Sequence, residues 1–83
     1  MVNLKVMVIK KYIVVSGHPV LFANELLHAD VAGVYKEQVE SAGFVALELS
    51  CKGVEVTCMG ESSSLNISSN PNIDELLILK FLS

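Results

Sequence analysis

Residues 44–59, FVALELSCKGVEVTCM, form the stretch that most strongly specifies a fold in this chain. Two runs in which apolar and polar residues alternate, Phe44–Cys51 and Val54–Met59, flank the pair Lys52-Gly53. Alternation with a period of two is typical of strands that bury one face. Glycine in a two-residue connection favours a tight turn. The stretch therefore predicts an antiparallel hairpin.

A turn at Lys52-Gly53 also predicts a register and a set of faces. It pairs Cys51 with Val54, Leu49 with Val56 and Leu47 with Cys58. These apolar side chains then face inward together, whereas the outward face carries Glu48, Ser50, Glu55 and Thr57. Cys51 and Cys58 would lie roughly 13 Å apart along the sheet, at about 3.3 Å per residue. That separation is too long for a disulfide, so we expect two buried, reduced thiols.

Working outward, the β-branched run at residues 2–16 predicts another strand. Gly17-His18 can form a two-residue turn, and Pro19 begins the next strand where a missing N–H is tolerated. This turn pairs Ser16 with Pro19 and Val15 with Val20. One face then carries Ile13, Val15, Val20 and Phe22, and the other carries Tyr12, Val14, Leu21 and Ala23. Because both faces are apolar, we expect the hairpin to be covered on both sides.

Two segments show helical features. Asn24 can cap a helix over residues 24–32, while Gly33 and Gln38 leave open whether residues 33–41 continue it. A second helix is expected over Asp74–Leu82, capped from Asn72 or, one turn earlier, from Asn70-Pro71. This helix is apolar nearly all round, which is typical of a helix that is buried or lies in an interface.

The order of predicted elements is therefore β-β-α-β-β-α within a single domain spanning residues 1–83. We predict an α+β fold in which the two β-hairpins form one antiparallel sheet with the helices packed on one face.

The composition points to a protein partner. Hydrophobic residues make up 52% of the 83 residues and charged residues only 18%, against about 25% in ordinary domains. So small a chain cannot bury all of that apolar surface in its own core. A second copy of the chain is the simplest partner that could cover the remaining apolar surface. The net charge of −3 and the absence of Arg argue against nucleic acid as a partner.

The sequence argues against insertion into a membrane. The longest stretch without a charged residue, Tyr12–Asn24, contains Gly17 and Pro19 and is shorter than the about 20 residues that span a bilayer. The segment Met1–Lys11 lacks the features of a signal peptide. We expect a cytoplasmic protein.

No stretch carries a strong catalytic or metal-binding signature, and we expect no metal and no cofactor. Glu25-Leu26-Leu27-His28 has the Glu-x-x-His spacing of carboxylate metal sites, which need further copies of it on facing helices. Ser62–Ser64 lack the glycine that follows a nucleophilic serine in a hydrolase elbow. If a ligand site exists, its candidate residues are the polar ones His28, Asp30, Glu61, Ser62, Ser64 and Asn66.

Three blocks carry a resemblance: HPVLFANELLHADVAG at 18–33, SAGFVALEL at 41–49 and GESSSLNI at 60–67. In this order the chain resembles small bacterial domains of the mobile-element kind, such as those of integron gene cassettes. The resemblance implies a compact, often oligomeric bacterial cytoplasmic domain. It implies no activity and no functional residue.

The leading hypothesis is thus a non-enzymatic homo-oligomeric binding or assembly module, a dimer that binds a small molecule or a peptide. The expected interface residues are Val14, Leu21, Leu76, Leu79 and Phe81, from the first hairpin, the last helix or both. The alternative is a small enzyme whose site forms at the subunit boundary from His28, Asp30 and the 61–66 loop. A third hypothesis, an antagonist of a nucleic-acid-binding protein, rests on acidity alone.

Overall fold

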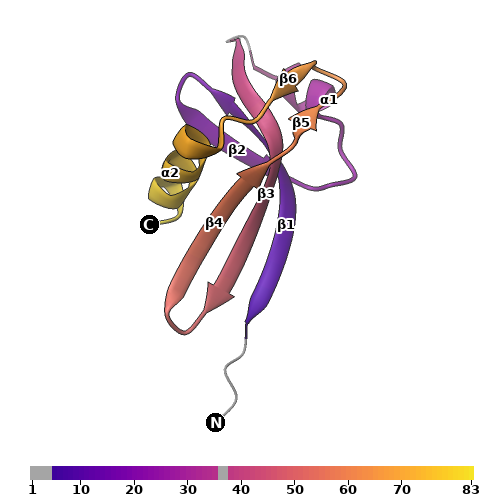
Figure 1. Ribbon diagram of the computed structural model, residues 1–83. Helices are drawn as coiled ribbons and strands as arrows, with labels where there is room; N and C mark the ends of the chain where they lie inside the picture. The colour runs from indigo at the N-terminus through magenta and orange to yellow at the C-terminus, as the bar shows by residue number, and fades with distance from the viewer. Residues whose placement is uncertain (1–4, 36–37) are drawn as a thin grey trace.

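The β-branched strand β1, Val6–Val15, lies inside the main sheet, between β2, His18–Phe22, and β3, Val39–Ser50. The structure is a computed structural model that describes residues 5–35 and 38–83. Strand β4, Gly53–Met59, completes a four-stranded antiparallel sheet of order β2-β1-β3-β4 (Figure 1). The other elements are α1 (His28–Ala32), the small sheet of β5 (Glu61–Ser62) and β6 (Ile67–Ser68), and α2 (Pro71–Leu82). The predicted α+β class with an antiparallel sheet is confirmed.

The first hairpin turns one residue earlier than predicted. Ser16 and Gly17 occupy the turn with φ values of 50° and 76°, and Val15 pairs with His18. Two-residue hairpin turns with positive φ at both central positions match the twist of the flanking strands, which explains this choice. The predicted pairing of Val15 with Val20 is therefore wrong by two residues. A shift of two keeps every side chain on its predicted face.

The second hairpin shows the same displacement. Ser50 pairs with Gly53, so the turn lies at Cys51-Lys52 and Gly53, with φ 127°, closes it. The Ser50 hydroxyl accepts a hydrogen bond from the Lys52 N–H at 3.2 Å, a local contact that favours this turn. Leu49 pairs with Val54, and Glu48 with Glu55 on the opposite face. The predicted register is thus wrong, and so is the predicted burial of Cys51 and Leu49, which are both exposed at the end of the sheet. The predicted alternation of faces holds.

Two hydrophobic clusters lie on opposite faces of the sheet. Tyr12, Val14 and Val45 pack under Ile78 of α2, whereas Ile13 and its neighbours pack under α1 and the β5–β6 segment. The expectation that both faces of the first hairpin are covered is confirmed. The expectation that the helices share one face is wrong, because the hairpin's two apolar faces each need a cover and each helix supplies one.

The segment between β2 and β3 is less helical than predicted. Helix α1 is limited to His28–Ala32, and Leu27 takes the N-cap position without a side-chain bond. Asn24, the predicted cap, instead donates from Nδ2 to the Ile9 carbonyl at 3.0 Å. A helix over 33–41 is wrong from Val39 onward, because Val39 pairs with Val15 in the sheet. Residues 36–37 lie outside the described residues.

Helix α2 begins at Pro71 with Asn70 as N-cap, which is the earlier of the two predicted starts. Only Asp74 and Ile78 are buried along it. Beyond both helices, the N-terminal end of β1 and the hairpin of β3 and β4 extend as a projection (Figure 1). The molecule is accordingly elongated, with extents of 47 × 23 × 19 Å. We call Val6–Lys10, Leu47–Ser50 and Gly53–Val56 the projecting end of the sheet.

Candidate interaction surface

His28, one of the candidate site residues, is a core residue. Its side chain is buried, and Nε2 lies 2.9 Å from the Gly43 carbonyl, within hydrogen-bonding distance. The ring stands edge-on between Phe22 and Phe44, with centroid distances of 5.3 and 5.8 Å. A histidine held between two aromatic rings and a backbone carbonyl fastens α1 to the sheet, and its side chain is almost fully enclosed.

The remaining polar candidates come together only in part. The hydroxyls of Ser62 and Ser64 lie 3.2 Å apart, and Ser64 Oγ accepts a hydrogen bond from the Ala29 N–H at 3.3 Å. Ser62 is buried and also accepts from the Leu65 N–H. The serines therefore tie the β5–β6 segment to α1. Asp30, Glu61 and Asn66 are exposed, and Asn66 occupies a turn with φ 56°.

A buried polar cluster that the sequence analysis did not identify joins α2 to the sheet. The Asp74 carboxylate is 1% exposed and accepts hydrogen bonds from Tyr12 Oη at 2.5 Å, Ser41 Oγ at 2.8 Å and the Asn70 N–H at 2.8 Å. Charge-assisted bonds of this kind are about twice as strong as neutral ones. The sequence does contain one indication of this cluster, an aspartate on the core side of an apolar helix. It does not indicate the hydrogen-bond donors, because they lie far from Asp74 in the sequence.

Cys58 borders this cluster on β4. Its N–H donates to the Glu75 carboxylate of α2 at 2.8 Å. Burial, with the nearby Asp74 and Glu75 charges as smaller causes, raises the pKa of the Cys58 thiol from its ordinary 9.0 to about 11, against a hydrogen bond to Tyr12 that lowers it. Burial, followed by the hydrogen bond to Asp74, raises the pKa of Tyr12 far above its usual value. Both groups are therefore protonated near neutral pH, and the cluster is an anchor rather than a nucleophilic site.

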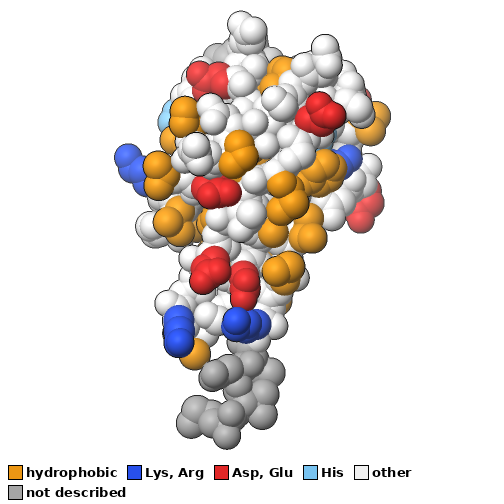
Figure 2. All heavy atoms as spheres, in the orientation of Figure 1, with side chains coloured by type: hydrophobic (Ala, Val, Ile, Leu, Met, Phe, Trp, Pro, Cys, Tyr) orange, Lys and Arg blue, Asp and Glu red, His pale blue; other side chains and the backbone are white. Residues whose placement is uncertain are grey.

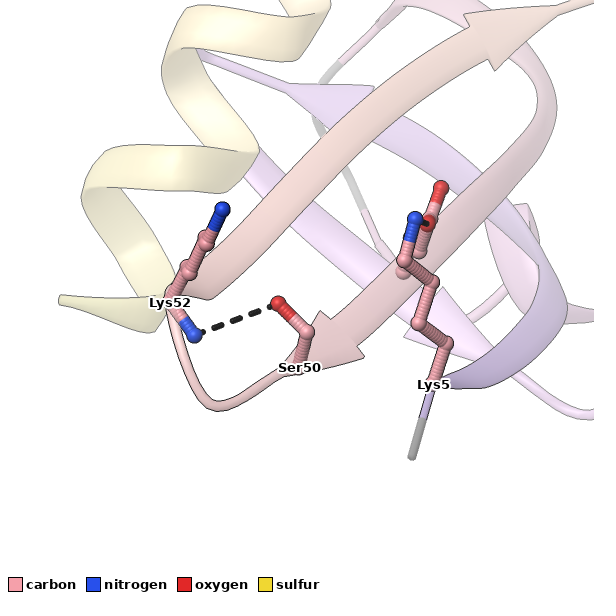
Figure 3. Close-up of polar contacts among 4 residues, drawn as sticks. Lys5, Ser50 and Lys52 are labelled. Carbon is pink, nitrogen blue, oxygen red and sulfur yellow. Dashed lines mark hydrogen bonds and ion pairs between the residues drawn. The ribbon is translucent and has the colours of Figure 1, made fainter. Parts of the chain in front are cut away.

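One face of the projecting end is polar. Lys5, Glu48, Ser50, Cys51, Lys52 and Glu55 line a shallow depression of about 270 Å³. The Lys5 ammonium lies 3.3 Å from the Glu48 carboxylate, and Figure 3 shows Lys5 beside Ser50 and Lys52 at the end of the sheet. An ion pair this exposed contributes little to stability, about 0–1 kcal/mol. Its charges of both signs suit a solvated surface.

The other face of the projecting end is apolar. A groove of about 410 Å³ is lined by Val8, Lys10, Leu21, Phe22, Ala23 and Leu47, where β2 ends beside β1. Val6, on this face, is 53% exposed. Met7 and Ile9 lie on the same face as Glu48 and are 61% and 48% exposed, so apolar side chains of β1 are accessible on both faces of the projecting end. Figure 2 shows hydrophobic side chains across the visible surface, with charged side chains scattered among them and a further group of both signs at the lower end.

The predicted interface residues fall into two groups. Val14 is buried beneath α2 and Leu21 is half-buried against the same cluster, so Val14 cannot meet a partner unless α2 moves. Leu76, Leu79 and Phe81 are exposed on α2. Phe81 also borders a cavity of about 310 Å³ with Leu77 and the tip of the first hairpin, at Gly17–Pro19. The helix therefore offers the larger accessible part of the predicted interface.

Among residues 5–35 and 38–83, no group of three or more His, Cys, Asp or Glu side chains is placed to hold a metal ion. The same residues contain no helix of the length and hydrophobicity that a membrane crossing requires. Comparison of the chain with models of protein families, with curated proteins and with solved structures finds no match.

Proposed function

We propose that this chain is a non-enzymatic, homo-oligomeric assembly or binding module, whose exposed apolar surface is covered by a second copy. The observation that carries the proposal is the exposure of large apolar side chains on regular elements. Leu76 is 69% exposed, Phe81 62% and Met7 61%. Contiguous apolar patches on soluble proteins mark binding or assembly surfaces.

Energetics support association. Fully burying a Leu, Met or Phe side chain contributes about 1.5–3 kcal/mol. Several such side chains occupy α2 and the projecting end, so covering either surface offsets a substantial part of the entropy that association costs. An isologous dimer buries the same patch twice and needs no second type of protein.

The environment of the polar candidates supports a binding role over a catalytic one. A small enzyme would need His28 to reach a substrate, whereas its ring contacts Phe22, Phe44 and the Gly43 carbonyl. The apolar groove beside β1 is instead suited to an apolar side chain from a peptide, a small molecule or a second copy. As the resemblance to integron cassette domains implies, we place this module in a bacterial cytoplasm.

Sedimentation or light scattering over a dilution series tests the proposal. We expect a mass twice the 9.0 kDa of the chain at micromolar concentration. Leu79→Lys and Met7→Lys place a charge on α2 and on β1, and at least one should lower the dimer fraction. Asp30→Lys, on the exposed side of α1, is the matched control and should leave the mass unchanged. A wild-type protein that stays at 9.0 kDa throughout contradicts the proposal.

A further inference from the structure

Strand β1 has an open edge. Strand β2 pairs only with Lys11–Val15, and Asn24 closes the edge at Ile9 by its bond to the Ile9 carbonyl. Among residues 5–35 and 38–83, no strand pairs with Val6–Lys10 on this side of β1. Exposed edges of this kind are templates for pairing with another chain, and proteins commonly protect them with charges, proline or bulges. Val6–Ile9 carries none of these protections.

The pairing pattern identifies which peptide groups face the open edge. Val15 and His18 flank the two-residue turn, so the main chain of Val15 points toward β2. Peptide groups alternate sides along a strand, so Ile9, Met7 and Lys5 point the same way. The Asn24 bond to the Ile9 carbonyl agrees independently with this assignment. Met7 and Lys5 therefore direct an N–H and a C=O toward the vacant position.

Resting on the proposed homo-oligomer, we infer that Lys5–Ile9 pairs antiparallel with the same segment of a second copy, with Met7 opposite Met7. Antiparallel pairing of identical strands has a two-fold axis, as an isologous dimer requires. Asn24 limits the register. Its bond holds the Ile9 carbonyl, which leaves the Ile9 N–H to donate to the Lys5 carbonyl of the partner, and a strand cannot pair beyond Ile9 without displacing Asn24. In this register Val6 lies opposite Val8, and Lys5 lies opposite Ile9.

The side chains suit a second copy of this strand. Both faces of Val6–Ile9 are apolar, so each partner presents apolar side chains to both faces of the other. The Val6 side chain of one copy would enter the apolar groove beside Val8 and Leu47 of its partner. Directly opposed cross-strand pairs of this kind stabilise a sheet.

The charges favour the register with Met7 on the two-fold axis over the adjacent register with Val8 on the axis. With Met7 on the two-fold axis, Lys5 faces Ile9 and keeps its own Glu48 partner at 3.3 Å. With Val8 on the axis, Lys5 would face Lys11 of the other copy, and like charges directly opposite are destabilising. That arrangement would also drive the partner strand into Asn24.

Disulfide trapping tests the register. In a Cys51→Ser background, which removes the exposed thiol, Met7→Cys and Ile9→Cys are made separately. Opposed residues in a hydrogen-bonded antiparallel pair have Cα atoms about 5.5 Å apart, inside the 4.4–6.8 Å range of disulfides. Ile9 and its counterpart would be separated by roughly 13 Å along the strands. Both native side chains are substantially exposed, at 61% and 48%, so either variant should fold.

With oxidised glutathione as oxidant, we expect a covalent dimer from Met7→Cys at micromolar protein, none from Ile9→Cys, and none from either variant in denaturant. A cross-link from Ile9→Cys alone overturns the register. A wild-type dimer by light scattering, without a cross-link from Met7→Cys, overturns this interface but leaves the homo-oligomer standing. A monomeric wild type overturns both. Leu79→Lys added to Met7→Cys should leave the cross-link intact, and its loss would place the interface on α2.

Discussion

The Tyr12 hydroxyl donates a 2.5 Å hydrogen bond to the Asp74 carboxylate, joining the centre of β1 to α2 across 62 positions of sequence. Both side chains are almost fully buried. Ser41 from β3 and the Asn70 N–H complete the carboxylate's partners. Together with the packing of Ile78 and the bond from the Cys58 N–H to Glu75, these contacts hold α2 against the sheet.

Removing the Tyr12 hydroxyl should destabilise the protein. Tyr12→Phe leaves a buried carboxylate with one donor fewer, which costs about 1–3 kcal/mol. Urea unfolding followed by circular dichroism measures the loss. Tyr35→Phe, at a tyrosine that is 38% exposed, is the matched control and should change the free energy of unfolding by less than about 0.5 kcal/mol. Equal values for the two variants would mean that the hydrogen bond contributes nothing to stability.

Gly43 should not tolerate a side chain. A Cβ atom there would lie 2.5 Å from the Met59 carbonyl oxygen and 3.1 Å from Cβ of Ser69. Relief of that overlap requires β3 and β4 to move apart, so Gly43→Ala should lower the free energy of unfolding by about 1–3 kcal/mol. At Gly33, with φ −63° and its nearest contact at 3.4 Å, alanine fits, and Gly33→Ala should be neutral or stabilising. The same urea titration compares them, and the reverse order of stabilities refutes the packing argument.

The two thiols should react at very different rates. Cys51 lies in an exposed turn, whereas Cys58 is 4% exposed and its thiol has a pKa raised to about 11. Because only the thiolate is a nucleophile, an aromatic disulfide reagent at pH 8 should modify one thiol quickly and the second only after unfolding. Cys51→Ser should abolish the fast phase. Two fast phases in the folded wild type would show that Cys58 is accessible.

Alkaline pH should destabilise the fold. The folded-state pKa of Cys58 is raised from 9.0 to about 11, and burial shifts that of Tyr12 in the same direction. Above pH 9 the unfolded chain therefore releases protons that the folded chain retains, and the free energy of unfolding falls as pH rises. Below pH 9 these groups add no pH dependence.

Urea unfolding at a series of pH values from 7 to 11 measures this decline. Cys58→Ala should make the decline shallower between pH 9 and 11, and Tyr12→Phe should do so independently. If the free energy of unfolding of the wild-type protein stays constant up to pH 11, the pKa values of Cys58 and Tyr12 are not raised by burial.

The strand pattern was largely predictable because it is local. Alternation around Lys52-Gly53 and the β-branched run before Gly17 were enough to predict two hairpins and the face of each side chain. The turn positions were each wrong by one residue, since the choice depends on backbone torsions: Ser16 adopts positive φ with Gly17, and Gly53 closes its turn rather than standing inside it. Each error moved the register by two and left the faces unchanged.

The candidate site was less predictable. The sequence offers His28 as a candidate ligand residue, but its ring packs between Phe22 and Phe44. In the sequence Asp74 marks only the start of a helix, yet it accepts the most hydrogen bonds of any carboxylate among the described residues. Its donors Tyr12 and Ser41 come from separate strands, and no local pattern brings them together.

The sequence by itself determined the elements whose signal repeats every two residues: the strands, their faces, and the apolar surplus that needs a cover. Only the tertiary structure decided where the helices lie and whether Val39–Ser41 forms a helix or a strand. This segment pairs with β1, because the sheet offers long-range hydrogen bonds that a short, glycine-interrupted helix cannot match. The tertiary structure also placed α1 and α2 on opposite faces, since a sheet that is apolar on both sides must be covered on both. A periodic pattern depends only on residues that are close in the sequence. The burial of the Asp74 carboxylate and the unpaired edge of β1 at Met7 depend on residues that meet only when the chain folds.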